Sequence, residues 1–141
     1  MSLYRSLASP YIPFIIREYT HWTLMIHDNQ SYLGRSYLWL VREGSMQRLS
    51  AITLAERDEL WEILHSYEAA LHELWKPDLI NYAWLGNLVS AHGGHGHMHL
   101  IPRYITPRTI DATEFIDSEW GRHYDPKREW NPTLQGVCTS E

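Results

Sequence analysis

The clearest pattern of apolar and polar positions along the chain predicts a long helix over residues 54–75. Thr53 and Glu56 have the spacing of a capping box, in which each side chain satisfies a backbone N–H group of the first turn. Pro77 ends the pattern, because the residue before a proline avoids the α region. Between these limits apolar residues recur at helical spacing, at Leu60, Ile63, Leu64, Tyr67, Leu71, Leu74 and Trp75.

Shorter apolar runs predict strands on either side of this helix. Residues 22–27, 36–42 and 79–85 are rich in β-forming side chains, and a turn signal follows each of them. We expect 36–42 and 79–85 to be central strands, because both of their faces are apolar. A fourth strand is expected over residues 95–101. Strands before and after one helix, without regular alternation, indicate an α+β fold with an antiparallel sheet.

The length of 141 residues fits a single domain over 1–141, with an irregular N-terminal arm at 1–13 and a polar C-terminal tail at 125–141. The net charge of −5 gives no basic footprint for nucleic acid. No apolar run approaches the ~20 residues of a membrane span, so we expect no membrane partner and a cytoplasmic location. The single cysteine, Cys138, permits neither an internal disulfide nor a cysteine-based zinc site.

Histidines are concentrated in the run His95-Gly96-His97-Met98-His99. Alternate residues of a strand face the same side, so three imidazoles about 6.6 Å apart would form one row. This row could be an exposed polar face, although ordinary strand patterning does not favour imidazoles. It could bind a metal, with His92 as a further ligand, although no carboxylate lies within the run. Alternatively, a neutral imidazole, near its unperturbed pKa of about 6.5, could attack phosphorus while its neighbours hold the oxygens.

The segment His95-Gly96-His97-Met98-His99-Leu100-Ile101 resembles the signature of the histidine triad (HIT) superfamily, His-φ-His-φ-His-φ-φ with φ apolar. Gly96 is a departure, since that φ position usually holds a larger side chain. The following Pro102-Arg103 and the upstream segment 81–87 are also similar to the family, and the segment 119–124 is similar to a tail of one bacterial branch. The resemblance covers about residues 20–125, and it points to bacterial HIT proteins of the diadenosine polyphosphate hydrolase type.

The resemblance implies a HIT-like fold, in which a five-stranded antiparallel sheet carries one long helix and a shorter one. A homodimer would extend the sheet to ten strands. The implied activity is hydrolysis or transfer at the α-phosphorus of a nucleotide substrate, such as a dinucleoside polyphosphate or a nucleoside phosphoramidate, through a covalent nucleotidyl-histidine. No cofactor is required for this chemistry, although a divalent cation can accompany the nucleotide. Two alternatives stay open: a nucleotide-binding HIT protein with little turnover, and a metal-binding protein built on the histidine cluster.

By the same resemblance, the catalytic residues are the three histidines of the row. His97 would be the nucleophile, and His99 would sit near the bridging oxygen and assist the leaving group. His95 would support the site and orient His97 through its backbone carbonyl, which would fix the ring nitrogen that carries the proton.

The substrate-binding residues implied by the resemblance lie in two loops. Ribose hydroxyls would meet Asp28, with Asn29 as second choice, although both residues could simply cap a turn. Phosphate would meet the loop that contains Ser90 and His92, which could equally be a plain connector. Asn87, or Asn81 in its place, could bind phosphate or ribose. Arg35 replaces a fourth histidine of many family members, and its guanidinium would offer a fixed fork to phosphate oxygens.

Overall fold

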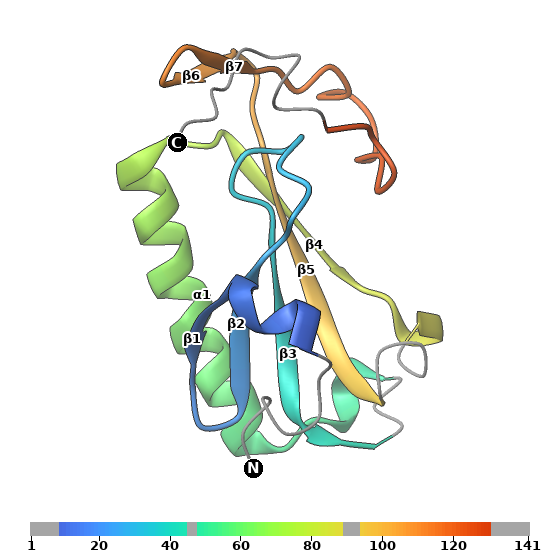
Figure 1. Ribbon diagram of the computed structural model, residues 1–141. Coiled ribbons are helices and arrows are strands. Elements are labelled where there is room, and N and C mark those ends of the chain that lie inside the picture. Colours follow the sequence, from blue (N-terminus) through green and yellow to red (C-terminus); the bar gives the residue numbers. More distant parts are fainter. Residues whose placement is uncertain (1–8, 45–47, 89–93, 131–141) are drawn as a thin grey trace.

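The computed structural model describes residues 9–44, 48–88 and 94–130 of the chain, and its central element is a five-stranded antiparallel sheet (Figure 1). The strand order is β1-β2-β3-β5-β4. The strands are β1 (Ile15–Glu18), β2 (Trp22–Ile26), β3 (Ser36–Glu43), β4 (Leu79–Trp84) and β5 (His95–Arg103). Helix α1 (Leu54–Leu74) connects β3 to β4, and a small hairpin of β6 (Arg108–Ile110) and β7 (Thr113–Phe115) follows β5. Three 3-10 turns complete the described elements: η2 (Ser9–Phe14), η3 (Leu49–Ala51) and η4 (Gly86–Leu88).

The helix and the four expected strands are confirmed, and so is the α+β class with its antiparallel sheet. The central position expected for 79–85 is wrong, because β4 is an edge strand that pairs only with β5 among the described residues. Its apolar side chains are not all covered: Leu79 is 64% exposed and Tyr82 is 45% exposed. The apolar run at 79–85 therefore does not mean that the strand has a neighbour on each side, since part of it forms exposed apolar surface.

Two other expectations need comment. The shorter helix implied by the resemblance takes the form of 3-10 turns, the longest being η2, and α1 is the one α-helix of the described chain. Of the expected N-terminal arm, residues 9–13 belong to η2, and of the C-terminal tail, residues 125–130 lack regular structure. Residues 1–8 and 131–141, with Cys138, lie outside the described residues.

Helix α1 covers one face of the sheet and builds the main core. Its start is the expected capping box, since Thr53 Oγ1 accepts from the N–H of Glu56 and the Glu56 carboxylate accepts from the N–H of Thr53. Arg42 of β3 also donates two hydrogen bonds to the Glu56 carboxylate, and it holds the pKa of that carboxyl at about 2. The buried core residues are Trp22, Leu24, Leu38, Leu40, Leu60, Ile63, Tyr67, Leu71, Met98 and Leu100. Within the described ranges, α1 and the 3-10 turns are too polar or too short to cross a bilayer.

The opposite face of the sheet carries the candidate chemistry, because side chains alternate along each strand. Residues with even numbers on β2, β3 and β5 contribute to the core under α1, and those with odd numbers face away from it. The antiparallel pairing aligns the odd residues in rows: Thr23, Trp39 and His97 form one row, and Met25, Tyr37 and His99 form the next. We call this surface the histidine face.

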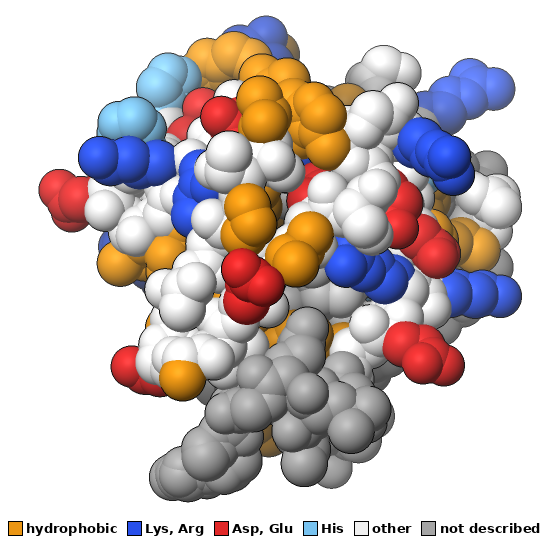
Figure 2. Space-filling view, turned by 90° about the horizontal axis from the view of Figure 1, so that it is seen from above, with side chains coloured by type: hydrophobic (Ala, Val, Ile, Leu, Met, Phe, Trp, Pro, Cys, Tyr) orange, Lys and Arg blue, Asp and Glu red, His pale blue; other side chains and the backbone are white. Residues whose placement is uncertain are grey.

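A C-terminal strap, defined here as residues 117–130, lies at the end of the sheet near the β6–β7 hairpin (Figure 1). Arg103, the last residue of β5, holds it in place. The buried guanidinium donates to both carboxylate oxygens of Asp117, to the backbone oxygens of Glu119 and Arg122, and to Oδ1 of Asn81. All five N–H groups of this arginine are therefore used. Seen from that end of the molecule, acidic and basic side chains are interspersed with small hydrophobic groups (Figure 2).

Candidate active site

The three histidines of β5 share the histidine face, as their alternate spacing predicted. Pairing with β3 places His97 opposite Trp39 and His99 opposite Tyr37. The exposure of the imidazoles rises along the strand: His95 is 0% exposed, His97 is 2% exposed and His99 is half-buried. Of the three imidazoles, that of His99 is therefore the most accessible to solvent in the described structure.

His95 is anchored to the neighbouring strand. Its Nδ1 atom lies 2.6 Å from the backbone oxygen of Leu40, and because a carbonyl can only accept, Nδ1 carries the proton. A bulge in β3 brings Glu43 opposite His95, with 3.8 Å between Nε2 of the histidine and Oε2 of the glutamate. The side chain of His95 is therefore fixed inside the sheet, and its backbone carbonyl is held with it.

His97 is oriented by this carbonyl. Its Nδ1 atom lies 3.3 Å from the backbone oxygen of His95, which is the contact expected from the resemblance. Nδ1 must donate to the oxygen, so the lone pair of the neutral ring is on Nε2. The rings of Trp39 and His99 flank the imidazole, with centroids 5.6 Å and 5.2 Å away. This packing fixes the plane of the ring and therefore the direction in which Nε2 points.

His99 lies between the ring of His97 and the ring of Tyr37, whose centroid is 6.1 Å away. It is the member of the triad that reaches the edge of the buried region. Tyr37 and Trp39 were not among the residues singled out in the sequence. The sequence shows that they alternate on one face of the expected strand 36–42, and the structure shows that this face lies beside two of the histidines.

The next row of the histidine face contains His27 and Arg35. The backbone N–H of His27 donates to the backbone oxygen of Arg35, so the two residues lie opposite each other at the ends of β2 and β3. Burial, with the charge of Arg35 as a second cause, lowers the pKa of His27 to about 4, although Asp28 acts in the opposite direction. His27 is therefore neutral near pH 7, and its Nδ1 accepts from the N–H of Asn29 at 3.0 Å.

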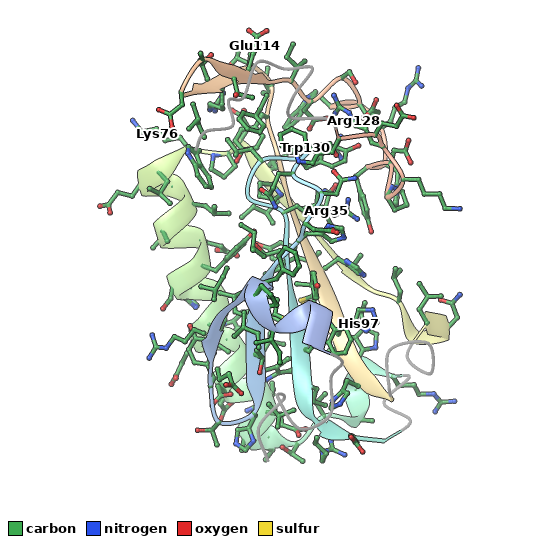
Figure 3. All side chains as sticks on the ribbon, viewed as in Figure 1. Arg35, Lys76, His97, Glu114, Arg128 and Trp130 are labelled. Atoms are coloured by element: carbon green, nitrogen blue, oxygen red, sulfur yellow. The ribbon has the colours of Figure 1, made fainter. Side chains whose placement is uncertain are left out.

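Arg35 is buried, with 2% of its surface exposed. Its guanidinium carbon lies 5.7 Å from the centroid of the Tyr124 ring, which belongs to the C-terminal strap. Nε and Nη1 donate no hydrogen bond to the described residues. Burial lowers the pKa of this arginine, but a guanidinium stays charged in proteins. Figure 3 shows Arg35 nearer to the strap, and His97 further down the sheet.

The other candidate binding residues are only partly brought together. Asp28 is an exposed carboxylate beside His27, with 3.1 Å between its Oδ1 and Nδ1 of the histidine. Asn29 is engaged in the loop, because its Oδ1 accepts from the N–H of Ser31 and its Nδ2 donates to the backbone oxygen of Arg128. This is the turn-capping role that competed with ribose binding. Asn87 is exposed on η4.

Three candidate positions remain, one on β4 and two in the segment that precedes β5 in the sequence. Asn81, the alternative to Asn87, accepts from Arg103 and so belongs to the attachment of the strap. Ser90 and His92 lie outside the described residues. Across 9–44, 48–88 and 94–130, no three His, Cys, Asp or Glu side chains are arranged to hold a metal ion.

Comparison with known proteins gives a consistent result for the fold. No family model and no curated protein matches the sequence. A HIT family protein from Bacillus anthracis is 21% identical with a TM-score of 0.52, and the match covers 64% of this chain and 63% of that one. A HIT family member from Bacillus subtilis is 18% identical with a TM-score of 0.52, over 65% and 64% of the two chains. A histidine triad protein from Bradyrhizobium japonicum is 22% identical with a TM-score of 0.57, over 75% and 76%.

These likenesses show that the chain has the fold of HIT proteins, as the triad signature predicted. The chain matches less than two thirds of the length of the two Bacillus proteins. At identities of 18% to 22% the likeness concerns the arrangement of the elements, and the chemistry has to be argued from the residues.

Proposed function

We propose that this chain is a nucleotide hydrolase or transferase that cleaves its substrate at the α-phosphorus through a covalent bond to His97. The observation that carries the proposal is the contact of Nδ1 of His97 with the backbone oxygen of His95, at 3.3 Å. It assigns the proton to Nδ1 and the nucleophilic lone pair to Nε2. The HIT fold and the row of three histidines on one face support the same chemistry.

The reaction has two displacements at phosphorus. In the first, Nε2 of His97 forms a bond to the α-phosphorus while the bond from phosphorus to the leaving oxygen or nitrogen breaks. The leaving atom keeps the electron pair of that bond. His99, the next residue of the row, assists the departing atom, which gains a proton. In the second, water bonds to the phosphorus, the N–P bond breaks with its electron pair returning to Nε2, and a nucleoside monophosphate and a proton are released. Two such steps replace one difficult displacement.

The protein contributes orientation and a low-dielectric environment to both steps. His95 is fixed by Leu40 and in turn fixes His97, so the attacking nitrogen needs little reorganisation. The rings of Trp39 and Tyr37 pack along the imidazoles and exclude water from their sides. In such surroundings, donors aimed at the phosphoryl oxygens act more strongly than they would in water.

The substrate would be bound by those candidate residues that are exposed to solvent. Asp28 offers an exposed carboxylate for ribose hydroxyls, and Asn87 offers an exposed amide for phosphate or ribose. Ser90 and His92 stay proposals for phosphate binding from outside the described residues. The chemistry requires no metal, and a divalent cation would enter only as a companion of the nucleotide.

The test is to trap the covalent intermediate. The wild-type protein is mixed with an α-³²P-labelled nucleotidyl substrate and quenched with denaturant, and we expect label on the protein that is released by acid. His97→Ala should carry no label, whereas His72→Ala, which changes an exposed histidine of α1, should label like the wild type. Turnover by His97→Ala at a rate comparable to the wild type would refute the nucleophile.

Two further measurements separate the alternatives. Stoichiometric nucleotide binding without label would indicate a binding protein with little turnover. Activity that disappears with EDTA and returns with a metal would favour a metal site at the histidine cluster. A substrate panel of diadenosine polyphosphates, AMP-morpholidate and AMP-lysine then identifies the leaving group.

A further inference from the structure

Two arginines are buried beside the histidine face, and their surroundings differ. Arg103 is 3% exposed and donates all five N–H groups to Asp117, Asn81 and backbone oxygens. Arg35 is 2% exposed, and its Nε and Nη1 make no hydrogen bond to the described residues. A buried charged donor without an acceptor is costly, so such groups are normally matched by a partner. Arg103 has its partners within the chain, whereas Nε and Nη1 of Arg35 have no acceptor among the described residues.

The charges around Arg35 do not fill this role. The carboxylates of Asp28 and Asp125 act electrostatically on Arg35, but neither forms an ion pair within 4.0 Å of its guanidinium. Tyr124 packs on the guanidinium with its ring, and His27 opposite is neutral near pH 7. A planar fork of N–H donors in such surroundings matches a carboxylate or a phosphoryl group.

The position of Arg35 relates it to the triad. It lies two residues before Tyr37, which pairs with His99, so Arg35 is one step beyond His99 on the histidine face, or about 6.6 Å along the strand. His97 is one step back in the opposite direction. The order along the face is therefore His97, then His99, then Arg35. Figure 3 shows the separation of Arg35 and His97 along the sheet.

We propose that Arg35 binds a second anionic group of the substrate, on the leaving-group side of the α-phosphorus. This inference rests on the function proposed above, in which His97 attacks phosphorus and His99 assists the leaving atom. The substrate class that it selects is a nucleotidyl polyphosphate, whose leaving group carries a phosphoryl group of its own. A nucleoside phosphoramidate with an uncharged amine as leaving group has nothing to place at Arg35.

The kinetic test compares two substrates that share AMP as the transferred group, diadenosine tetraphosphate and AMP-morpholidate. Arg35→Gln should lower kcat/KM for the tetraphosphate by about 100-fold, the size of effect expected for loss of a charged donor to a reacting group. The loss for the morpholidate should be about threefold or less, since its leaving group does not reach Arg35. Arg35→Lys should fall between these results, because it keeps the charge but not the fork. Arg57→Gln, which removes an exposed arginine of α1, is the matched control.

A binding test needs no turnover. Inorganic pyrophosphate should raise the Tm of the wild type and of Arg57→Gln in proportion to its occupancy, and it should not raise the Tm of Arg35→Gln. Equal losses of kcat/KM on both substrates in a folded Arg35 variant would overturn the proposal. So would a pyrophosphate shift that survives Arg35→Gln.

The two proposals fail in different ways. If the wild type turns over neither substrate, the proposed function fails, and the pyrophosphate shift alone decides whether Arg35 is an anion site. If Arg35→Gln does not fold, the ratio of the two kcat/KM values in Arg35→Lys decides the kinetic part. A ratio equal to that of the wild type would then count against the role of the arginine.

Discussion

The backbone oxygen of His95 accepts a hydrogen bond from Nδ1 of His97 over 3.3 Å, so one residue of the triad orients the next through the main chain. The side chain of His95 has another task. Its Nδ1 donates to the backbone oxygen of Leu40 at 2.6 Å, and this bond fixes the peptide group that His97 contacts. The side chain of His95 therefore stabilises the sheet, while its carbonyl orients His97. Mutations can distinguish these two contributions.

We predict that His95→Ala lowers the free energy of unfolding by about 2 kcal/mol, because the buried oxygen of Leu40 loses its donor. Turnover should slow by about tenfold, as is typical when a supporting residue is removed. Urea denaturation and the labelling assay measure the two effects. A folded His95→Ala protein that forms no adduct at all would show that the imidazole of His95, and not only its carbonyl, takes part in the reaction.

We predict a pH dependence of stability that originates from His27. Its pKa is about 4 in the folded chain, against 6.5 in the unfolded one, so the unfolded state binds more protons between these values. The contribution of neutral His27 to stability is thus complete above pH 6.5 and is lost as the pH falls towards 4. The loss is on the order of 3 kcal/mol.

The measurement is the urea midpoint of wild type and His27→Gln between pH 7 and 4. The difference between the two proteins should shrink or reverse in favour of the variant at the acid end. NMR titration should also show the pKa of His27 rising in Arg35→Gln, because the charge of Arg35 is one cause of the depression. A pKa of His27 near 6.5 in the wild type would contradict the burial of its ring.

We predict that the ion pair of Arg103 and Asp117 is required for the attachment of the strap. Both side chains are buried, so Arg103→Met leaves an uncompensated carboxylate and should cost about 3–5 kcal/mol of unfolding free energy. The exposed pair of Arg57 and Asp58 is the control, and Arg57→Met should change stability by less than about 1 kcal/mol. Urea denaturation measures both. Faster tryptic cleavage at Lys127 in Arg103→Met would locate the effect in the strap. Equal losses of unfolding free energy in Arg103→Met and Arg57→Met would contradict the predicted role of the ion pair.

We predict a homodimer that forms through the free edge of β4. In the described chain no strand lies beyond β4, and edge strands expose backbone groups that can pair with another copy. Gel filtration should give about twice the chain mass of 16.7 kDa. Leu79→Asp with Tyr82→Asp should produce a monomer, because both side chains are exposed on β4. Ile16→Asp, on β1 at the other edge of the sheet, is the control, and a dimer that dissociates only in this control would place the interface there.

The features that the sequence predicted correctly depend on residues close together in the chain. The capping box of Thr53 and Glu56 and the apolar stripe behind it define α1 without any distant contact. The same holds for the histidine row, because strand alternation alone places His95, His97 and His99 on one face. The contact of His97 with the carbonyl of His95 was expected from the resemblance to the HIT family, and it involves residues only two positions apart.

The features that escaped prediction depend on partners far away in the sequence. The strap has no periodicity, since its order comes from Arg103 and from Tyr32, which bonds with Glu119 and with the N–H of Asp125. The edge position of β4 depends on which strand pairs with β5 on its other side. The side chain of Asn29 suits ribose binding as well as a turn. Only the position of Arg128 in the folded chain reveals that the amide donates to a backbone oxygen of the strap.

Strand β5 carries different kinds of side chain on its two faces. Its even positions, Met98 and Leu100, belong to the core under α1, while its odd positions carry the imidazoles and Arg103. A slip of one residue in its pairing would exchange the two faces, so that apolar groups would meet water and imidazoles would be driven under the helix. The register that buries Met98 and Leu100 under α1 is therefore the same one that aligns the three imidazoles on the opposite face. For the function proposed above, a copy of the chain with a slipped β5 would lack its active site.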